Sequence, residues 1–235
     1  MARRIASIKS FFKYFYQEKF IESNPTDRIR IPKVPKRAPS SLSQDEVRQF
    51  IAAPSPGDKD FLLNRAVLVL MYSVGLRVSE LASLRVENIN LERRIVVIPG
   101  KGAKERIVPL QDPVIDVLLS YFDEREKLYP ESMAPKNNAF LKPSASGLVP
   151  MNVRRIQYLV EKHGKIAGLS THVHPHLLRH SIATHLIEEG CSVEAVRQTL
   201  GHEDLATTSI YLKTASKFLK DEHNKHNPVS NLLNS

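Results

Sequence analysis

Several short segments of the chain place cationic or nucleophilic side chains beside glycines. In the segment 75–81, Arg77 follows a glycine suited to ending a helix, and Glu80 lies three residues further on the same helical face. One interpretation is a surface ion pair, which contributes little to stability. The other is a guanidinium that its carboxylate neighbour holds ready for an anion. The segment by itself does not decide between them.

A glycine-bearing loop between two runs of β-branched residues carries two lysines. Lys101 lies between Gly100 and Gly102, and Lys104 follows in the same loop. A lysine in a turn is usually only solvated, but one at the tip of a hairpin in a basic protein can also reach into a groove of DNA. Lys101 is therefore a candidate for chemistry, and Lys104 is a candidate DNA contact.

The stretch 171–185 holds five histidines: His172, His174, His176, His180 and His185. Imidazole is a common zinc ligand, but neither an HExxH motif nor a cysteine partner accompanies these residues, so no metal site is expected. Pro175 favours a helix start, and on that helix His176 and Arg179 lie three residues apart and face the same way. An imidazole and a guanidinium on one helical face suit a phosphate group.

Two further candidates follow a glycine near the carboxyl-terminal end of the chain. Gly201 is predicted to end a helix, His202 comes directly after it, and Tyr211 follows nine residues later. A lone tyrosine is most often a half-buried packing residue. Like each of the other three segments, this one alone does not indicate a function. The order of the four segments along the chain is more informative.

The composition is that of a basic globular protein. The chain has 235 residues, with 34 Lys and Arg against 25 Asp and Glu and a net charge of +9. A pI of about 9.6 fits either a nucleic-acid partner or a generally basic surface. The sequence shows no membrane-spanning apolar run and no secretory signal, and Cys191 alone cannot form an intrachain disulfide. We therefore expect a protein of the reducing cytoplasm, not of a membrane.

Hydrophobic periodicity predicts a mainly helical fold with a small antiparallel β-sheet. Ser43 and Glu46 have capping-box spacing ahead of an apolar helical face. Two β-branched runs joined by the glycine-bearing loop predict a β-hairpin over about 94–110, and 139–141 is a candidate third strand. Helices are predicted at 4–20, from residue 43, and at about 60–74, 78–83, 113–127, 151–167, 174–189 and 192–200.

The chain is predicted to have four parts: a helix in 1–27, a linker over 28–42, a main domain over 43–215 and a tail over 216–235. Prolines keep the linker extended, and it carries no acidic residue. A cation run without acids favours contact with DNA phosphates over a plain spacer. The cations of the linker are Arg28, Arg30, Lys33, Lys36 and Arg37.

The order of these segments resembles that of the tyrosine recombinase (phage integrase) family. An arginine, a Gly-Lys-Gly hairpin, His-x-x-Arg, Leu-Gly-His and a tyrosine nine residues later fill all six catalytic positions of the family. The segments 75–81, 100–110 and 176–186 look most like the Xer branch, which resolves chromosome dimers. The resemblance covers about residues 1–220 and implies the catalytic domain fold of that family for 43–215. It also implies that 1–27 is a remnant, the last helix of an N-terminal core-binding domain.

The resemblance assigns a role to each candidate. Tyr211 would be the nucleophile, Lys101 would protonate the leaving 5′ oxygen, and Glu80 would brace Arg77. The side chains around the scissile phosphate would be Arg77, Arg179, His176 and His202. The intermediate would be a 3′-phosphotyrosyl bond, which conserves the energy of the broken phosphodiester, so neither ATP nor a metal nor another cofactor is needed.

The implied partners are double-stranded DNA and further copies of the chain. In the family, a carboxyl-terminal helix such as 216–235 docks on the neighbouring protomer of a tetramer on two DNA sites. We expect exchange of this kind over a helix folded back on its own domain. The remaining alternatives are a mobile-element or phage-type integrase, a DNA-binding scaffold without turnover, relaxation of supercoils by one protomer, and a histidine-site metalloenzyme.

Overall fold

The computed structural model describes residues 2–30, 41–100, 105–128, 137–144 and 147–201 of the chain. The chain divides into two compact units, Met1–Ser40 and Ser41–Ser235. Among the residues that are described, no helix is long and apolar enough to cross a lipid bilayer.

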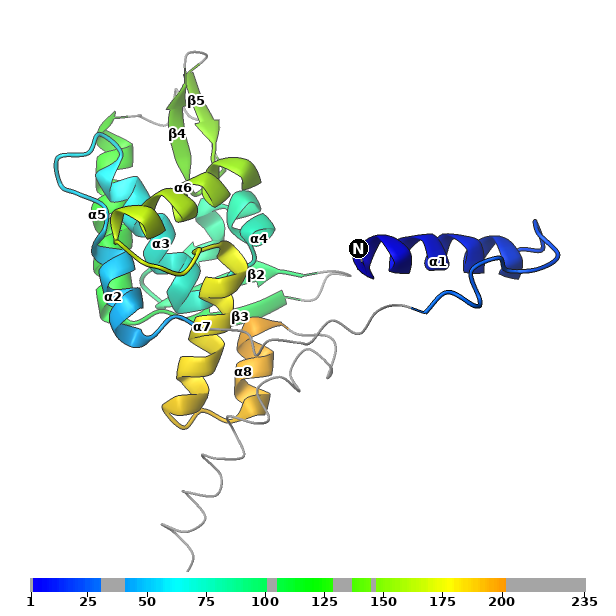
Figure 1. The fold of residues 1–235 in the computed structure, drawn as a ribbon. Helices are drawn as coiled ribbons and strands as arrows, with labels where there is room; N and C mark the ends of the chain where they lie inside the picture. Colours follow the sequence, from blue (N-terminus) through cyan, green and yellow to red (C-terminus); the bar gives the residue numbers. More distant parts are fainter. Residues whose placement is uncertain (1, 31–40, 101–104, 129–136, 145–146, 202–235) are drawn as a thin grey trace, which may run out of the picture. The chain divides into compact units, whose positions relative to one another are not determined.

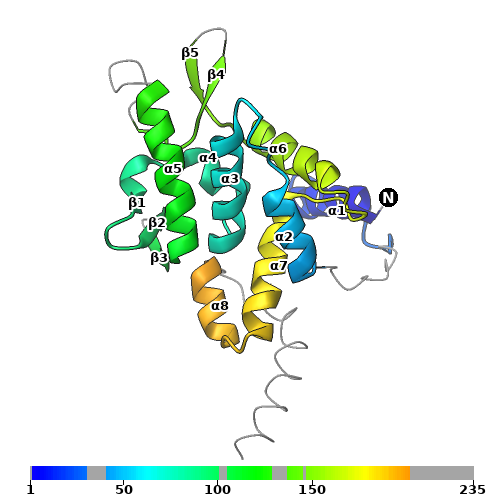
Figure 2. The same ribbon diagram turned by 90° about the vertical axis from the view of Figure 1, so that its left-hand side faces the viewer.

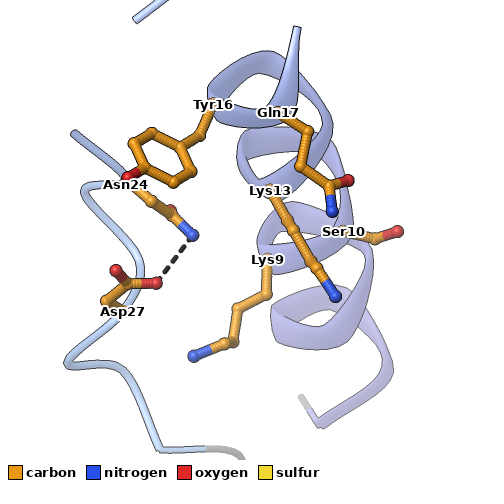
Figure 3. A pocket seen from close by; sticks show the side chains of 7 residues that line it. All are labelled: Lys9, Ser10, Lys13, Tyr16, Gln17, Asn24 and Asp27. Atoms are coloured by element: carbon orange, nitrogen blue, oxygen red, sulfur yellow. Dashed lines mark hydrogen bonds between the residues drawn. The ribbon is translucent and has the colours of Figure 1, made fainter. Parts of the chain in front are cut away.

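The first unit begins with helix α1 (Ala2–Gln17), which ends at Gln17 although the sequence predicted helix up to residue 20. The ammonium group of Lys9 donates hydrogen bonds to the carbonyls of Thr26 and Ile29, each at 2.8 Å. These bonds fold the segment after α1 back onto the helix. The helix and this segment line a hollow of about 430 Å³. Figure 3 shows the side chains around it, which are Lys9, Ser10, Lys13, Tyr16, Gln17, Asn24 and Asp27.

The second unit is mainly helical, as the sequence predicted, and it contains the site. Its α-helices begin and end close to the predicted positions, and one short 3₁₀ helix was not predicted (Figure 1). They are α2 (Gln44–Ala52), α3 (Phe61–Val74), α4 (Val78–Ser83), the short 3₁₀ helix η1 (Val86–Asn88), α5 (Asp112–Leu128), α6 (Val153–Ile166), α7 (Pro175–Glu188) and α8 (Val193–Leu200).

The predicted β-hairpin forms the main part of a three-stranded antiparallel sheet. Strand β2 (Ile95–Pro99) pairs with β3 (Glu105–Pro109), with Val97 opposite Ile107. The third strand is β1 (Ile89–Asn90), which pairs with β2. A strand of two residues has too few side chains for a period to be visible in the sequence.

The candidate strand at 139–141 is wrong in its bounds. Only Leu141 of that run lies in a strand, β4 (Leu141–Ser144), which pairs antiparallel with β5 (Gly147–Pro150) in a separate sheet. Ala139 and Phe140 are buried before the strand begins. The Ala139 N–H donates to the carbonyl of Leu84, and Phe140 stacks on Tyr121. The apolar run therefore packs into the core before it enters a strand.

The core of the second unit is built around α3. This helix is apolar on nearly all sides, and α2, α5, α6 and α7 all contact it (Figure 2). A helix that is hydrophobic all round is a buried central helix. A smaller cluster joins α7 to α8 through Ala183, Ile187, Val196 and Leu200. This second cluster fixes the end of α8 relative to α7.

Three predicted helix boundaries are confirmed, and they orient the site. Ser43 and Glu46 make both bonds of the capping box at the start of α2. Pro175 is the first residue of α7. Gly75 ends α3 in the left-handed conformation, with φ 64°, so the chain reverses directly before Arg77, the N-cap of α4.

Candidate active site

The carbonyl groups at the end of α8 accept hydrogen bonds from three arginines that come from three different elements. Arg106 of β3 donates from Nε to the Thr199 carbonyl at 2.9 Å. Arg179 of α7 donates from Nη2 to the Leu200 carbonyl. Arg77 donates from Nη2 to the Gly201 carbonyl at 3.0 Å. The last carbonyls of a helix lack partners within the helix and carry its negative dipole end, so cations bind there readily.

Arg77 and Glu80 form the ion pair that their spacing predicted. Nη1 of Arg77 lies 2.8 Å from Oε1 of Glu80, and the backbone N–H of Arg77 donates to Oε2 at 2.8 Å. Arg106 binds the same carboxylate from the other side, with Nη1 to Oε1 at 2.9 Å and Nη2 to Oε2 at 2.7 Å. The Arg77 side chain remains 40% exposed, so its guanidinium is held but open to solvent.

Glu80 stays ionised in this setting. Burial of the carboxyl group raises its pKa, and this is the largest single effect. The hydrogen bonds from Arg106 and from the Arg77 backbone, the charge of Arg106 and the hydrogen bond from the Arg77 side chain together exceed it and lower the pKa from 4.5 to about 2. A carboxylate that is ionised at every working pH gives Arg77 a constant partner.

Arg179 is buried, with 6% of its surface exposed. Its Nη1 donates to the Gly75 carbonyl at 2.6 Å, in addition to the bond from Nη2 to Leu200. The ends of α3 and α8 therefore both hold this guanidinium. His176 lies one helical turn before Arg179 on α7 and is exposed.

Of the histidines ahead of α7, His174 caps the helix. Nδ1 of His174 accepts from the Leu177 N–H at 3.2 Å and caps the helix. Burial first, and then the neighbouring His172 and His176, lower the pKa of His174, which favours the neutral ring that this cap requires. Within the described ranges, no three His, Cys, Asp or Glu side chains gather as metal ligands.

His185 binds the backbone of Leu42, near the start of the second unit. Its Nε2 donates to the carbonyl of Leu42 at 2.8 Å, so Nδ1 is left to accept from the Tyr72 hydroxyl at 2.7 Å. Ser181, one turn earlier on α7, accepts from the Leu42 N–H at 2.9 Å. The start of the second unit is thus fastened to the helix that carries Arg179.

The structure brings together three of the predicted site residues, Arg77, Glu80 and Arg179, at the end of α8. Arg28 and Arg30 are exposed in the first unit. Several predicted residues lie outside the described ranges: Lys33, Lys36, Arg37, Lys101, Lys104, His202 and Tyr211. Those residues remain predictions, as does the tail 216–235.

Sequence reasoning missed Arg106. Along β3, Arg106 and Val108 face inward while Ile107 is 63% exposed. An arginine on the inward side of a strand needs a buried partner, because an unpaired charge is costly there. In the sequence, the position of Arg106 two residues before Val108 in a predicted strand places both on one face. This spacing was the available signal, but it did not identify Glu80 as the partner.

Comparison with known proteins gives the family. The phage integrase family model matches residues 40–217. Tyrosine recombinase XerD of Vibrio vulnificus is 36% identical over 228 residues, which are 97% of this chain and 73% of that protein.

Solved structures agree with this assignment. The XerA recombinase superposes with a TM-score of 0.66 at 29% identity and covers 95% of this chain and 74% of its own. The XerH site-specific recombinase, in a post-cleavage complex with a palindromic difH substrate, superposes with a TM-score of 0.71 at 26% identity, over 90% of this chain and 62% of its own. The chain therefore belongs to the phage integrase family and is a tyrosine recombinase, a DNA strand-transferring enzyme.

Proposed function

We propose that this chain carries out site-specific recombination of the Xer type on double-stranded DNA, with Tyr211 as nucleophile. The observation that carries the proposal is the meeting of Arg77 and Arg179 at the end of α8. The described chain ends at Gly201, directly before His202 in the sequence. The similarity to XerD supports a role in resolving chromosome dimers, and hence in chromosome segregation.

Each proposed residue type suits one task in phosphodiester transfer. The two arginines bind the non-bridging oxygens and remain charged throughout, which stabilises the transition state electrostatically. A phenol with a pKa of about 10 is hardly ionised at neutral pH, so His176 takes its proton. His202 donates a hydrogen bond to the same phosphate.

The reaction balances without a cofactor. The Tyr211 oxygen forms a bond to phosphorus, the bond from phosphorus to the 5′ oxygen breaks, and Lys101 gives that oxygen a proton. The product is a 3′-phosphotyrosyl bond and a free 5′ hydroxyl. Attack by the 5′ hydroxyl of another strand reverses these steps and completes strand exchange.

A nicked duplex that releases the cleaved fragment tests this proposal. The full chain is mixed with the duplex and run in detergent beside Tyr211→Phe, with Tyr158→Phe as a matched control because Tyr158 is 69% exposed on α6. A detergent-resistant adduct is expected for the wild type and Tyr158→Phe and is absent in Tyr211→Phe. An adduct that survives in Tyr211→Phe would overturn the assignment of the nucleophile.

The proposed assembly is a tetramer on two DNA sites, with the segment 216–235 of each copy docked on its neighbour. Apolar side chains at Ala215, Phe218 and Leu219 recur at helical spacing and support this role. Deletion of 216–235 is expected to abolish assembly on a two-site duplex while binding to one site persists. Assembly that is unchanged by the deletion would contradict exchange.

A further inference from the structure

Arg106 of β3 contacts two other parts of the candidate site, Glu80 on α4 and the carbonyl of Thr199 at the end of α8. It is the second residue of β3, and Lys101 comes five residues before it in the sequence. Its guanidinium binds both oxygens of Glu80 on α4, and its Nε binds the Thr199 carbonyl at the end of α8. Only 11% of its side chain is exposed.

The contacts of Arg106 control the carboxylate that holds Arg77. Glu80 accepts four hydrogen bonds, two from Arg106 and two from Arg77. The two-point contact from Arg106 fixes the plane of the carboxylate, because a guanidinium and a carboxylate pair in a common geometry. Arg106 therefore sets the direction in which Oε1 of Glu80 faces Arg77.

The backbone beside Arg106 is shaped for its close approach. A β-carbon on Gly201 would lie 3.1 Å from Nη1 and 3.2 Å from Cδ of Arg106. Gly201 also has φ 65°, a conformation that glycine adopts readily. The glycine that ends α8 thus makes room for the guanidinium that binds its last turn.

We infer that Arg106 is a positioning residue for strand transfer. It holds Arg77 through Glu80, whose carboxylate both arginines bind. The inference rests on the proposed function, since the groups it positions are those of the proposed site. Lysine cannot replace it, because an ammonium is a point charge that cannot bind both carboxylate oxygens and a carbonyl in one plane.

The first test compares single-turnover cleavage of the nicked duplex by wild type and Arg106→Lys at saturating protein. The rate is expected to fall about 10- to 100-fold, as for a displaced catalytic group, while the dissociation constant for the duplex is unchanged. Arg94→Lys is the matched control, since Arg94 makes an exposed ion pair with Asp112 and its variant should cleave at the wild-type rate. A normal rate for Arg106→Lys would overturn the inference.

A double-mutant cycle separates positioning from general stabilisation. If Arg106 acts through Glu80, then adding Arg106→Lys to Glu80→Gln lowers the cleavage rate by less than about twofold further. Rate losses that multiply fully, as for independent sites, would contradict action through Glu80. Thermal unfolding of each variant shows that the rates are compared between folded proteins.

A measurement that does not depend on DNA cleavage separates the role of Arg106 from the proposed recombinase function. The rotation of the Arg77 guanidinium is followed by NMR, with its signal identified by its loss in Arg77→Lys. Faster rotation is expected in Arg106→Lys than in the wild type, and equal rotation would overturn the inference even if the wild type formed no adduct. Absence of the adduct in the wild type would count against the proposed function alone.

Discussion

Gly75 at the end of α3 lies so close to Leu200 at the end of α8 that a β-carbon on residue 75 would be 2.4 Å from Cδ2 of Leu200. The carbonyls of these same two residues bind the guanidinium of Arg179. The contact between the two helix ends therefore sets the separation of the carbonyls that hold Arg179. A small residue at position 75 is part of the site's geometry as well as a helix end.

Gly75→Ala is expected to lower the free energy of unfolding by about 2–4 kcal/mol, because it adds both a steric overlap and an unfavourable positive φ. Gly168→Ala is the matched control. Gly168 has φ 69°, but a β-carbon there would meet nothing within 4 Å. Chemical denaturation of both variants measures the difference, and equal losses would show that the approach to Leu200 does not matter.

The low pKa of Glu80 predicts a loss of stability in acid. Its pKa is about 2 in the folded protein, against 4.5 ordinarily, so the unfolded chain binds the proton more readily. The stabilisation is fully present above about pH 4.5 and is lost as the pH falls towards 2. The upper limit is about 3.5 kcal/mol, from a difference of about 2.5 pKa units at about 1.4 kcal/mol each.

Urea unfolding between pH 6 and pH 3.5 measures this effect. The difference in unfolding free energy between wild type and Glu80→Gln is expected to shrink as the pH falls. Glu87→Gln serves as control, because Glu87 pairs with Arg85 at the surface with 65% of its side chain exposed. A difference for Glu80→Gln that stays constant with pH would contradict the ionised, buried carboxylate.

Ser181 holds Leu42, near the start of the second unit, against α7, and its contribution to stability can be tested. Its hydroxyl donates to the Leu177 carbonyl and accepts from the N–H of Leu42, which is fully buried. Ser181→Ala leaves that N–H without a partner and is expected to cost about 1–3 kcal/mol of unfolding free energy.

Ser120→Ala is the matched control for this prediction. The Ser120 hydroxyl also donates to the carbonyl one turn earlier, that of Asp116, but it is exposed. Its replacement is expected to change stability by less than about 0.5 kcal/mol. If both variants unfold alike, the bond to Leu42 is not what Ser181 contributes.

The local parts of the site could be predicted from the sequence, because neighbours in the chain determine them. Arg77 and Glu80 are three residues apart at a helix start, and Pro175 and Gly75 mark helix boundaries by their backbone preferences. Their convergence on α8 could not be predicted by spacing, since it depends on the packing of α7 against α8. The family resemblance supplied the connection between Arg77 and Arg179.

The role of Arg106 and the bounds of the strand near 139–141 were not predicted. The partners of Arg106 are distant in the sequence, and the apolar run at 139–141 is too short to show a period. Arg106 binds a carboxylate and a carbonyl from elements far away in the sequence, and its periodicity in β3 indicates only an inward position. Ala139 and Phe140 are buried in the core before the ladder begins at Leu141. Burial and pairing produce the same pattern over so few residues.

The proposed binding of the linker to DNA predicts a change in salt dependence. Each cation that neutralises a phosphate contributes about 0.9 to the slope of the logarithm of the binding constant against the logarithm of salt concentration. Replacing Lys33, Lys36 and Arg37 by alanine is therefore expected to weaken duplex binding and flatten this slope. The matched control removes the same charge from three exposed, ion-paired arginines of the second unit: Arg48, Arg85 and Arg94.

Fluorescence anisotropy titrations at several salt concentrations give both slopes. The control variant is expected to keep a slope near that of the wild type. A linker variant with an unchanged slope would remove the segment 28–42 from the DNA interface.

The decisive experiment identifies the side chain that becomes linked to DNA. The chain has seven tyrosines, so the adduct formed with the nicked duplex is digested with nuclease and protease, and mass spectrometry locates the nucleotide-bearing residue. We expect a 3′-phosphodeoxynucleotide on Tyr211 and an unmodified peptide at every other tyrosine. A nucleotide on any other residue would contradict the assignment of Tyr211 as the nucleophile of this recombinase.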